Sequence, residues 1–242
     1  MSRFFGTALA LILPAALSLI GCASKPLDQA PFFEILDVST PDSPVTADLF
    51  LLNNPTPQHY LVIKANEEPR KVRHSQETTE RFQSEWKIIE GEDRERFYRQ
   101  DTSGDILLVA VIEHGENAIS LFRPPLIAAY HRLEPGESRT QDVAMKVVNL
   151  NNPSRLRESG RAKQTITYLD DCLVRTQWGS FPARRLSVQF SADLNLARVH
   201  VETILYVVPG YGLLIEEAEK TIRILGIFPQ YENTIRVLMR PD

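Results

Sequence analysis

The sequence has few of the residues that build metal sites, and those it has are dispersed. Of 242 residues only two are cysteine, and the five histidines occur singly, without a His-Glu-x-x-His spacing. Histidine and cysteine ligands of a bound metal normally cluster at short spacings. The local arrangement most similar to a metal site is His114 between Glu113 and Glu116, in a stretch where solvated turn residues are expected. We therefore predict no metal site and no cofactor.

Enzyme motifs are equally scarce. No Gly-x-Ser-x-Gly occurs. Two acidic pairs, Asp170-Asp171 and Glu216-Glu217, and the basic pair Arg184-Arg185 fall in stretches expected to be strands, where adjacent side chains point to opposite faces. Asp170-Asp171 is expected at a turn that starts a strand ending at Gln177. We assign no catalytic residue and predict that the protein is not an enzyme.

The charge balance is slightly acidic. There are 27 Lys and Arg residues against 31 Asp and Glu, a formal net charge of −4, and the pI is about 5.8. Proteins that bind nucleic acids carry a basic surface and usually a high pI. We therefore expect no nucleic-acid partner. A hydrophobic content of 43% is near the average of globular domains, so a core can form.

The N-terminus carries the longest apolar run. One basic residue, Arg3, precedes an apolar stretch of about 17 residues that ends at Ile20 and is interrupted by Pro14. A membrane-spanning helix needs about 20 apolar residues, and proline disfavours its interior. The run therefore indicates a cleaved secretory signal rather than a retained membrane span.

The run ends in Leu19-Ile20-Gly21-Cys22, which is similar to the lipobox of bacterial lipoproteins. The resemblance implies that signal peptidase recognises Leu19, Ile20 and Gly21 and removes residues 1–21. It also implies that Cys22 carries a diacylglycerol and a further acyl chain such as palmitate. A thiolate supplies the nucleophile for this lipidation. Two or more acyl chains give stable membrane anchoring.

The residue after Cys22 indicates where the protein is localised, and the neighbours of Cys172 indicate the environment of that cysteine. Ala23 replaces the aspartate that retains many lipoproteins in the inner membrane, which implies the periplasmic face of the outer membrane in a Gram-negative cell. In another envelope the resemblance implies the extracytoplasmic face of the cell membrane. Acylation of Cys22 leaves Cys172 without a partner. Because Cys172 adjoins Leu173 and Val174, we expect a buried apolar residue rather than a reactive thiol.

The rest of the chain divides into a tether and one domain. Residues 22–45 are predicted to hold the lipidated cysteine and a proline-containing tether, in which the apolar residues 32–36 latch against the domain. Residues 46–242 are predicted to form a single β-rich domain. A joint within it is placed near 123–137, where we expect two proline-containing turns to flank a short apolar piece.

Strand-length runs with period two fill this domain. Leu186, Val188, Phe190 and Ala192 alternate with polar residues, and residues 197–207 repeat the pattern. Residues 193–196 join the two runs, which predicts a β-hairpin. No convincing amphipathic helix of three turns is present. The predicted fold is all-β: a curved antiparallel sheet arranged as a sandwich, barrel or half-barrel, with few or no helices.

The second half carries a recognisable order of turns and strands. Gly179-Ser180-Phe181-Pro182-Ala183 is followed downstream by a run from Tyr206 through Pro209-Gly210-Tyr211-Gly212-Leu213. This arrangement resembles uncharacterised β-rich bacterial envelope proteins with a GxFxA…YxxPGxGL pattern, and it implies a long, curved antiparallel sheet. It implies no catalytic residue. The pattern needs only turn chemistry, because proline fixes φ and glycine accepts positive φ.

The function predicted from these features is an outer-membrane lipoprotein with a non-enzymatic interaction or scaffold role in the cell envelope. Its partners would be the membrane, through the lipid on Cys22, and an envelope protein held at sheet edges and loops. The alternative is a carrier whose curved sheet binds a lipid or another hydrophobic ligand in a trough. Aromatic residues that would line the trough are Phe181, Phe190, Tyr206, Tyr211 and Phe228. A hydrolase is a distant third.

We expect a Cys22→Ser variant to stay as an unprocessed precursor and to incorporate no labelled palmitate, because serine lacks the thiolate that lipidation uses. Metabolic labelling and electrophoretic mobility measure both effects. A Cys172→Ser variant is the control and should be processed and labelled normally. Normal labelling of the Cys22→Ser chain would contradict the lipoprotein prediction.

Overall fold

Residues 32–52, 54–65, 67–225 and 228–239 are described by a computed structural model, in which nearly all regular structure is β-strand. The only helical elements in these ranges are two short 3-10 turns, η1 (Ala47–Phe50) and η2 (Arg81–Gln83). None of their helices is long and apolar enough to cross a bilayer. The strands are β1 (Phe33–Ser39), β2 (Val45–Thr46), β3 (Gln58–Lys64), β4 (Arg70–Thr78), β5 (Trp86–Glu90), β6 (Arg94–Gln100), β7 (Ile106–Glu113), β8 (Ala118–Ala129), β9 (Arg132–Leu133), β10 (Ser138–Asn149), β11 (Leu156–Thr176), β12 (Gly179–Leu194), β13 (Ala197–Val208), β14 (Gly212–Ile224) and β15 (Phe228–Leu238).

The main sheet is antiparallel and closes on itself. Its order is β1-β11-β10-β8-β7-β6-β5-β4-β3-β15-β14-β13-β12, and β12 also pairs with β11. Twelve strands therefore form a closed ring, and β1 lies outside it on the far half of β11. The all-β antiparallel prediction is confirmed. The closed ring corresponds to the barrel among the predicted arrangements rather than to the half-barrel, because β11 pairs with β12 and β3 pairs with β15, which leaves no break in the ring.

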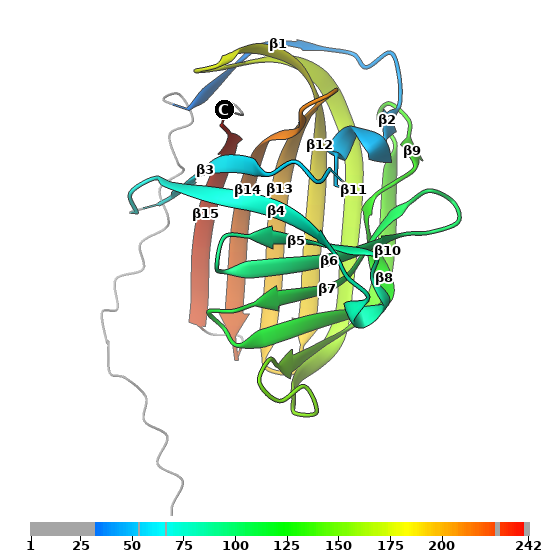
Figure 1. Cartoon of the computed structure of the whole chain (residues 1–242), viewed down its shortest axis with the longest axis vertical. Helices are drawn as coiled ribbons and strands as arrows, with labels where there is room; N and C mark the ends of the chain where they lie inside the picture. The colour runs from blue at the N-terminus through cyan, green and yellow to red at the C-terminus, as the bar shows by residue number, and fades with distance from the viewer. Residues whose placement is uncertain (1–31, 53, 66, 226–227, 240–242) are drawn as a thin grey trace, which may run out of the picture.

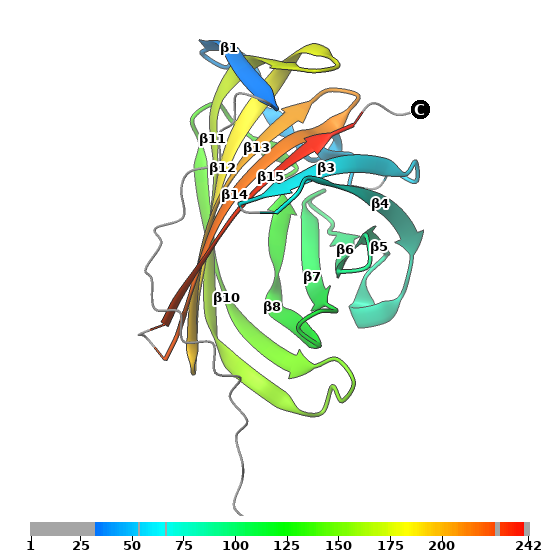
Figure 2. The same cartoon turned by 90° about the vertical axis from the view of Figure 1, so that its left-hand side faces the viewer.

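The ring is flattened into two walls. Strands β3 to β8 form one wall and β10 to β15 the other, and the strands of the two walls cross at a steep angle (Figure 1). The β11–β12 hairpin extends past the ring and carries β1 at its end (Figure 2). The apolar segment expected to latch onto the domain does so as β1, which pairs from Phe33↔Thr176 to Ser39↔Asp171.

One end of the barrel interior is filled by residues 45–50, which we call the plugging segment, and by β9. Val45 in β2, Ala47 and Phe50 in η1, and Leu133 in β9 are buried in one cluster with Trp86, Tyr98, Tyr168 and Leu186 from the ring. These plugging residues come from the short β2–β9 pair and from η1, and of these elements β2 and η1 follow directly after Pro44. Burial of several large side chains at this point fixes the plug to both walls.

The alternating runs form the hairpin that the pattern predicts. β12 and β13 pair from Asp193↔Arg198 to Arg184↔Val207, and Leu186 and Ala192 are buried on the inner face. Two expected turns are wrong. Asp170 and Asp171 lie in the middle of β11 rather than at its start, beside an irregularity after Tyr168. Pro124 and Pro125 lie inside β8 where its ladder with β7 is interrupted, a place where missing donors are tolerated.

Gly160 marks the closest approach of β11 and β12, because a Cβ added there would lie 1.9 Å from the carbonyl oxygen of Asp193. We expect Gly160→Ala to lower the free energy of unfolding by about 1–3 kcal/mol, since the two strands must move apart. Gly115→Ala is the matched control, because a Cβ there meets nothing within 4 Å. Urea unfolding measures both. Equal stability of the two variants would contradict the close approach.

Candidate functional site

One side of the barrel interior carries charged side chains where apolar ones would be expected. Glu90 at the end of β5, Arg94 and Arg96 in β6, Glu216 in β14 and Arg236 in β15 are joined by ion pairs. We refer to these five residues as the inner ion-pair network. β5 and β6 belong to one wall and β14 and β15 to the other, so the network links the two walls.

Glu90 is the centre of this network. It is 6% exposed, and its carboxylate lies 2.9 Å from Arg96 Nε, 3.3 Å from Arg236 Nη1 and 3.6 Å from Arg94 Nη1. Arg236 Nη1 also lies 3.3 Å from Glu216 Oε2. Burial alone would raise the pKa of Glu90, but the three guanidiniums outweigh it and hold the pKa well below its usual range. Glu90 is therefore a permanent negative charge rather than a proton donor.

Two aromatic rings border the network. The rings of Tyr60 and His74 lie 4.3 Å apart between centroids, and the Tyr60 hydroxyl donates to the carbonyl oxygen of Leu213 at 2.9 Å. Burial lowers the pKa of His74 to about 4, although Glu90 pulls it the other way. The imidazole is thus neutral at neutral pH. His74 Nε2 is buried and has no hydrogen-bond partner in the structure.

A small hollow separates the network from the plugging segment. Its volume is about 60 Å³, and four of the five network residues line it together with Tyr60, His74 and Phe50. This volume holds about two water molecules. Pockets for drug-sized ligands are about 300–1,000 Å³. The hollow is too small for an acyl chain, and it gives no support to the predicted lipid carrier.

A second charged surface lies on the outer face of β8 and β10–β14. The ladders place Arg123, Ala144, Arg161, Asp193, Arg198 and Arg223 side by side in one row across six strands. Residues directly opposite one another on paired strands project from the same face. A neighbouring row holds Asp142, Lys163, Ser191, His200 and Thr221. We call the five cations of these rows, Arg123, Arg161, Lys163, Arg198 and Arg223, the outer basic face.

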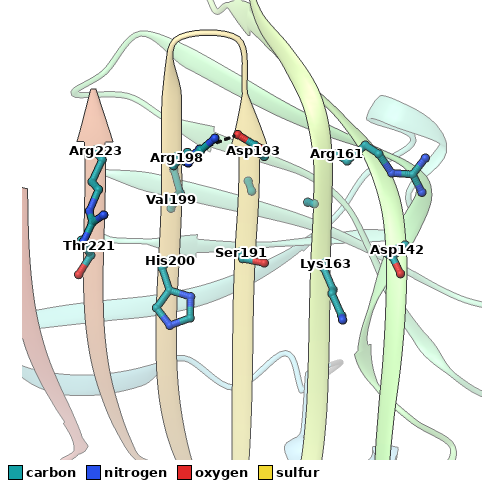
Figure 3. Close-up of a pocket in the computed structure, with 12 residues that line it drawn as sticks. Asp142, Arg161, Lys163, Ser191, Asp193, Arg198, Val199, His200, Thr221 and Arg223 are labelled. Atoms are coloured by element: carbon teal, nitrogen blue, oxygen red, sulfur yellow. Dashed lines mark hydrogen bonds and ion pairs between the residues drawn. The ribbon is translucent and has the colours of Figure 1, made fainter. Parts of the chain in front are cut away.

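The cations of this face are accessible. All five are exposed, and residues of the two rows line a broad open hollow on the surface of the sheet (Figure 3). Asp193 pairs with Arg198 at 3.1 Å, and both side chains are about 70% exposed. Such an exposed pair contributes little to folding. Arg198 and Arg223 lie on adjacent strands, about 4.8 Å apart, and Arg123, Arg161 and Arg198 lie on alternate strands of the row. The arrangement can therefore attract an extended anionic partner.

The residues predicted to direct processing and lipidation, Leu19, Ile20, Gly21 and Cys22, lie outside the described ranges. Cys172 is buried at 5% exposure, as expected, and burial raises the pKa of its thiol to about 11. It therefore stays protonated and unreactive at neutral pH. No group of three potential metal ligands occurs among the described residues.

The paired residues project from opposite faces as predicted. Glu216 joins Arg236 inside the barrel, whereas Glu217 accepts a 2.6 Å hydrogen bond from the Tyr206 hydroxyl. Asp170 pairs with Arg185, and Asp171 accepts from Tyr168 at 2.6 Å. None of these pairs presents two acids or two bases to one space.

Two other local arrangements also fail to form a reactive site. Ser84 and Lys87 have the Ser-x-x-Lys spacing of some acylating enzymes. Ser84 Oγ nevertheless donates to the carbonyl oxygen of Arg81, and Lys87 Nζ pairs with Glu77 and Glu95. His114 Nε2 lies 3.0 Å from Glu95 Oε1, at a turn. Ser84 and Lys87 therefore bond to other groups rather than to each other, and His114 contacts an acidic side chain rather than a hydroxyl or thiol.

The aromatic residues proposed for a ligand trough do not share one. Phe181 packs edge-on to Tyr211 with centroids 5.3 Å apart, and Tyr206 packs on Phe33 at 5.6 Å. Phe190 instead contacts Phe122, in a separate cluster. The side chain of Phe228 lies outside the described part of the chain.

The inner ion-pair network was missed at the sequence level because its members come from four strands. No short window contains both Glu90 and Arg236, and charged residues are normally assigned to the solvent face. One local signal was present. Arg94 and Arg96 are two residues apart and follow Glu90 across a tight turn. This spacing places Glu90, Arg94 and Arg96 on one face of a hairpin.

Because the pKa of His74 is lowered on folding, the unfolded chain takes up the proton first as pH falls. His74 therefore costs stability from about pH 6.5 downward, by about 2 kcal/mol between about pH 7 and pH 5. We expect His74→Gln to lose less stability than the wild type over this interval in urea titrations. His200→Gln, at an exposed position, should retain the wild-type pH dependence. Parallel pH profiles for wild type and His74→Gln would contradict the neutral, buried imidazole.

Comparisons with known proteins add one structural likeness. No family model matches the chain, and no curated protein is similar to it at a significant level. A solved structure, the hypothetical lipoprotein YmcC from Escherichia coli, superposes with a TM-score of 0.39 at 11% sequence identity. The superposition covers 79% of this chain and 93% of that one.

Proposed function

We propose that the chain is an extracytoplasmic lipoprotein whose barrel is a non-enzymatic interaction module of the bacterial cell envelope. Its anchor is the acylated Cys22, which follows the recognition residues Leu19, Ile20 and Gly21. With Ala23 next, its destination is the periplasmic face of the outer membrane in a Gram-negative cell. The support for this part of the proposal is the sequence at the N-terminus.

The observation that carries the interaction role is the concentration of positive charge on the outer basic face. The whole chain has a net charge of −4, yet this face carries five cations, with Asp142 and Asp193 as the acidic residues of its two rows. The strands from β8 to β14 span five spacings, about 24 Å. A surface of this width and sign favours a partner with extended negative charge.

Closure of the ring changes how a partner would be held. Sheet edges were expected to contribute, but in the described sheet only β1 ends the strand order, and the other strands are paired on both sides along at least part of their length. Strand addition needs a free edge. The proposal therefore assigns binding to the outer face and its loops. The small polar hollow inside the barrel does not favour the carrier alternative.

The test compares two variants with the same charge change. We expect Arg161→Glu with Arg223→Glu to reduce photo-crosslinking from position Ser191 in intact cells by about tenfold, because the face loses its complementarity to an anionic partner. Lys71→Glu with Arg73→Glu, at exposed positions of β4 in the other wall, should leave it unchanged. The same crosslinks from both variants, or none from the wild type, would overturn the proposal.

A further inference from the structure

The outer basic face ends in a patch of exposed aliphatic side chains. Leu196 lies in the turn between β12 and β13, and Ile224 and Leu225 lie at the end of β14. Their exposed fractions are 54%, 39% and 61%. Arg198 and Arg223 are each two residues from one of these leucines. We call these five residues the hairpin end.

Hydrogen bonds hold the turns of the hairpin end together. The backbone N–H of Leu225 donates to the carbonyl oxygen of Leu196 at 2.7 Å. The N–H of Leu196 donates to Glu158 Oε2 at 3.0 Å, and Asn195 N–H donates to the carbonyl oxygen of Ser159 at 3.2 Å. Leu196 and Leu225 are therefore held side by side on a fixed backbone, whereas Ile224, which pairs with Ala197, projects from the opposite face of β14.

Leucine at position 225 is not explained by folding. Its φ is 53°, in the left-handed region that glycine and asparagine adopt more readily than leucine. Because most of the side chain is exposed, it gains little from burial in the barrel. An exposed, large apolar residue at a backbone position that disfavours it points to a contact outside the chain.

The charges around the hairpin end indicate the chemistry of the partner. Arg198 and Arg223 adjoin the apolar residues, and Arg161 continues the row on β11. The nearby acids are already engaged, because Asp193 pairs with Arg198 and Glu158 accepts the Leu196 N–H. Apolar side chains flanked by arginine are the combination that binds an anionic lipid surface, with the apolar groups among the acyl chains and the guanidiniums at the phosphates.

We propose that the hairpin end docks on an anionic lipid leaflet, with Leu196 and Leu225 entering the interface and Arg198 and Arg223 contacting lipid phosphates. The inference rests on the proposed function, since it names the partner of the outer basic face. It assigns the barrel a membrane contact of its own, in addition to the lipid on Cys22. The eleven residues from Cys22 to Phe32 span at most about 40 Å.

The tether geometry sets the orientation. β1 is held at the far end of β11, and the hairpin end lies beside Ser159 near its start. Seventeen steps separate Ser159 from Thr176, about 56 Å along the strand. Because the tether is shorter than this separation, a barrel that contacts one leaflet through both the anchor and the hairpin end cannot stand with β11 perpendicular to the membrane.

The test uses the fragment Ala23–Asp242, which contains every strand and ion pair described above but no acylated cysteine. Co-sedimentation is measured with vesicles of phosphatidylcholine and with vesicles of equal parts phosphatidylcholine and phosphatidylglycerol. We expect binding to the anionic vesicles only. Arg198→Glu with Arg223→Glu should weaken it by about 30-fold or more, since each basic residue near the surface contributes about a factor of five.

Apolar variants separate lipid insertion from simple charge attraction. Leu196→Asn with Leu225→Asn should weaken vesicle binding by about tenfold, and asparagine suits the φ of residue 225, so the fold is kept. Val38→Asn with Leu173→Asn removes exposed apolar area at the other end and should bind as the wild type does. Thermal unfolding checks that all variants are folded.

The outcomes distinguish this inference from the proposed function. Loss of binding in both hairpin-end variants, with the control unchanged, supports lipid docking. Retained binding in the leucine variant overturns it. Absence of binding to anionic vesicles also overturns it, and crosslinking in cells that still depends on Arg161 and Arg223 then identifies an acidic protein as the partner. Crosslinking that is independent of those arginines overturns the proposed function itself.

Discussion

The structure depends on the ladder between β11 and β12, because this pairing closes the sheet. β11 pairs with β10 from Leu156 to Thr167 and with β1 from Asp171 to Thr176, while β12 pairs with its other side from Gly160 to Thr176. Without that ladder the chain would be an open sheet with two exposed edges, which are templates for unwanted strand pairing. Closure at Gly160 requires backbone contact that no larger residue accommodates without adjustment. The length and register of one hairpin therefore determine the architecture.

A closed ring of twelve strands encloses more space than a single layer of apolar side chains fills. Two sets of side chains fill this space in the barrel. The plugging segment contributes Ala47 and Phe50 to a buried apolar cluster, and the inner ion-pair network spans the remaining gap between the walls. Buried ion pairs seldom add net stability over apolar packing, but loss of one partner leaves a costly uncompensated charge. Glu90, with three arginine partners, therefore restricts how β5, β6 and β15 can be aligned.

Much of the β architecture could be predicted from the sequence, and the interior could not. Leu186 and Val188 alternate with polar neighbours, which is enough to identify β12 and its hairpin with β13. The same rule fails for Arg236 and Glu216, because it assigns charged positions to solvent when their partners are remote in sequence. It also gives no information about ring closure, which needs the β11–β12 ladder and also a ladder between β3 and β15, two strands far apart in sequence. Cys172 was correctly expected to be buried because its apolar neighbours are adjacent in the chain.

The place of Cys172 has a further consequence. It pairs with Val38 of β1 on one side and with Ala183 of β12 on the other, and it packs in the same cluster as Phe33. β1 is the described strand nearest Cys22 in sequence, so a pull on the proposed lipid anchor would reach this ladder first. Detachment of β1 removes one flank of the cover over the thiol. Under the proposed acylation of Cys22, Cys172 is the one free thiol of the chain, and its accessibility to a thiol reagent reports whether β1 is in place.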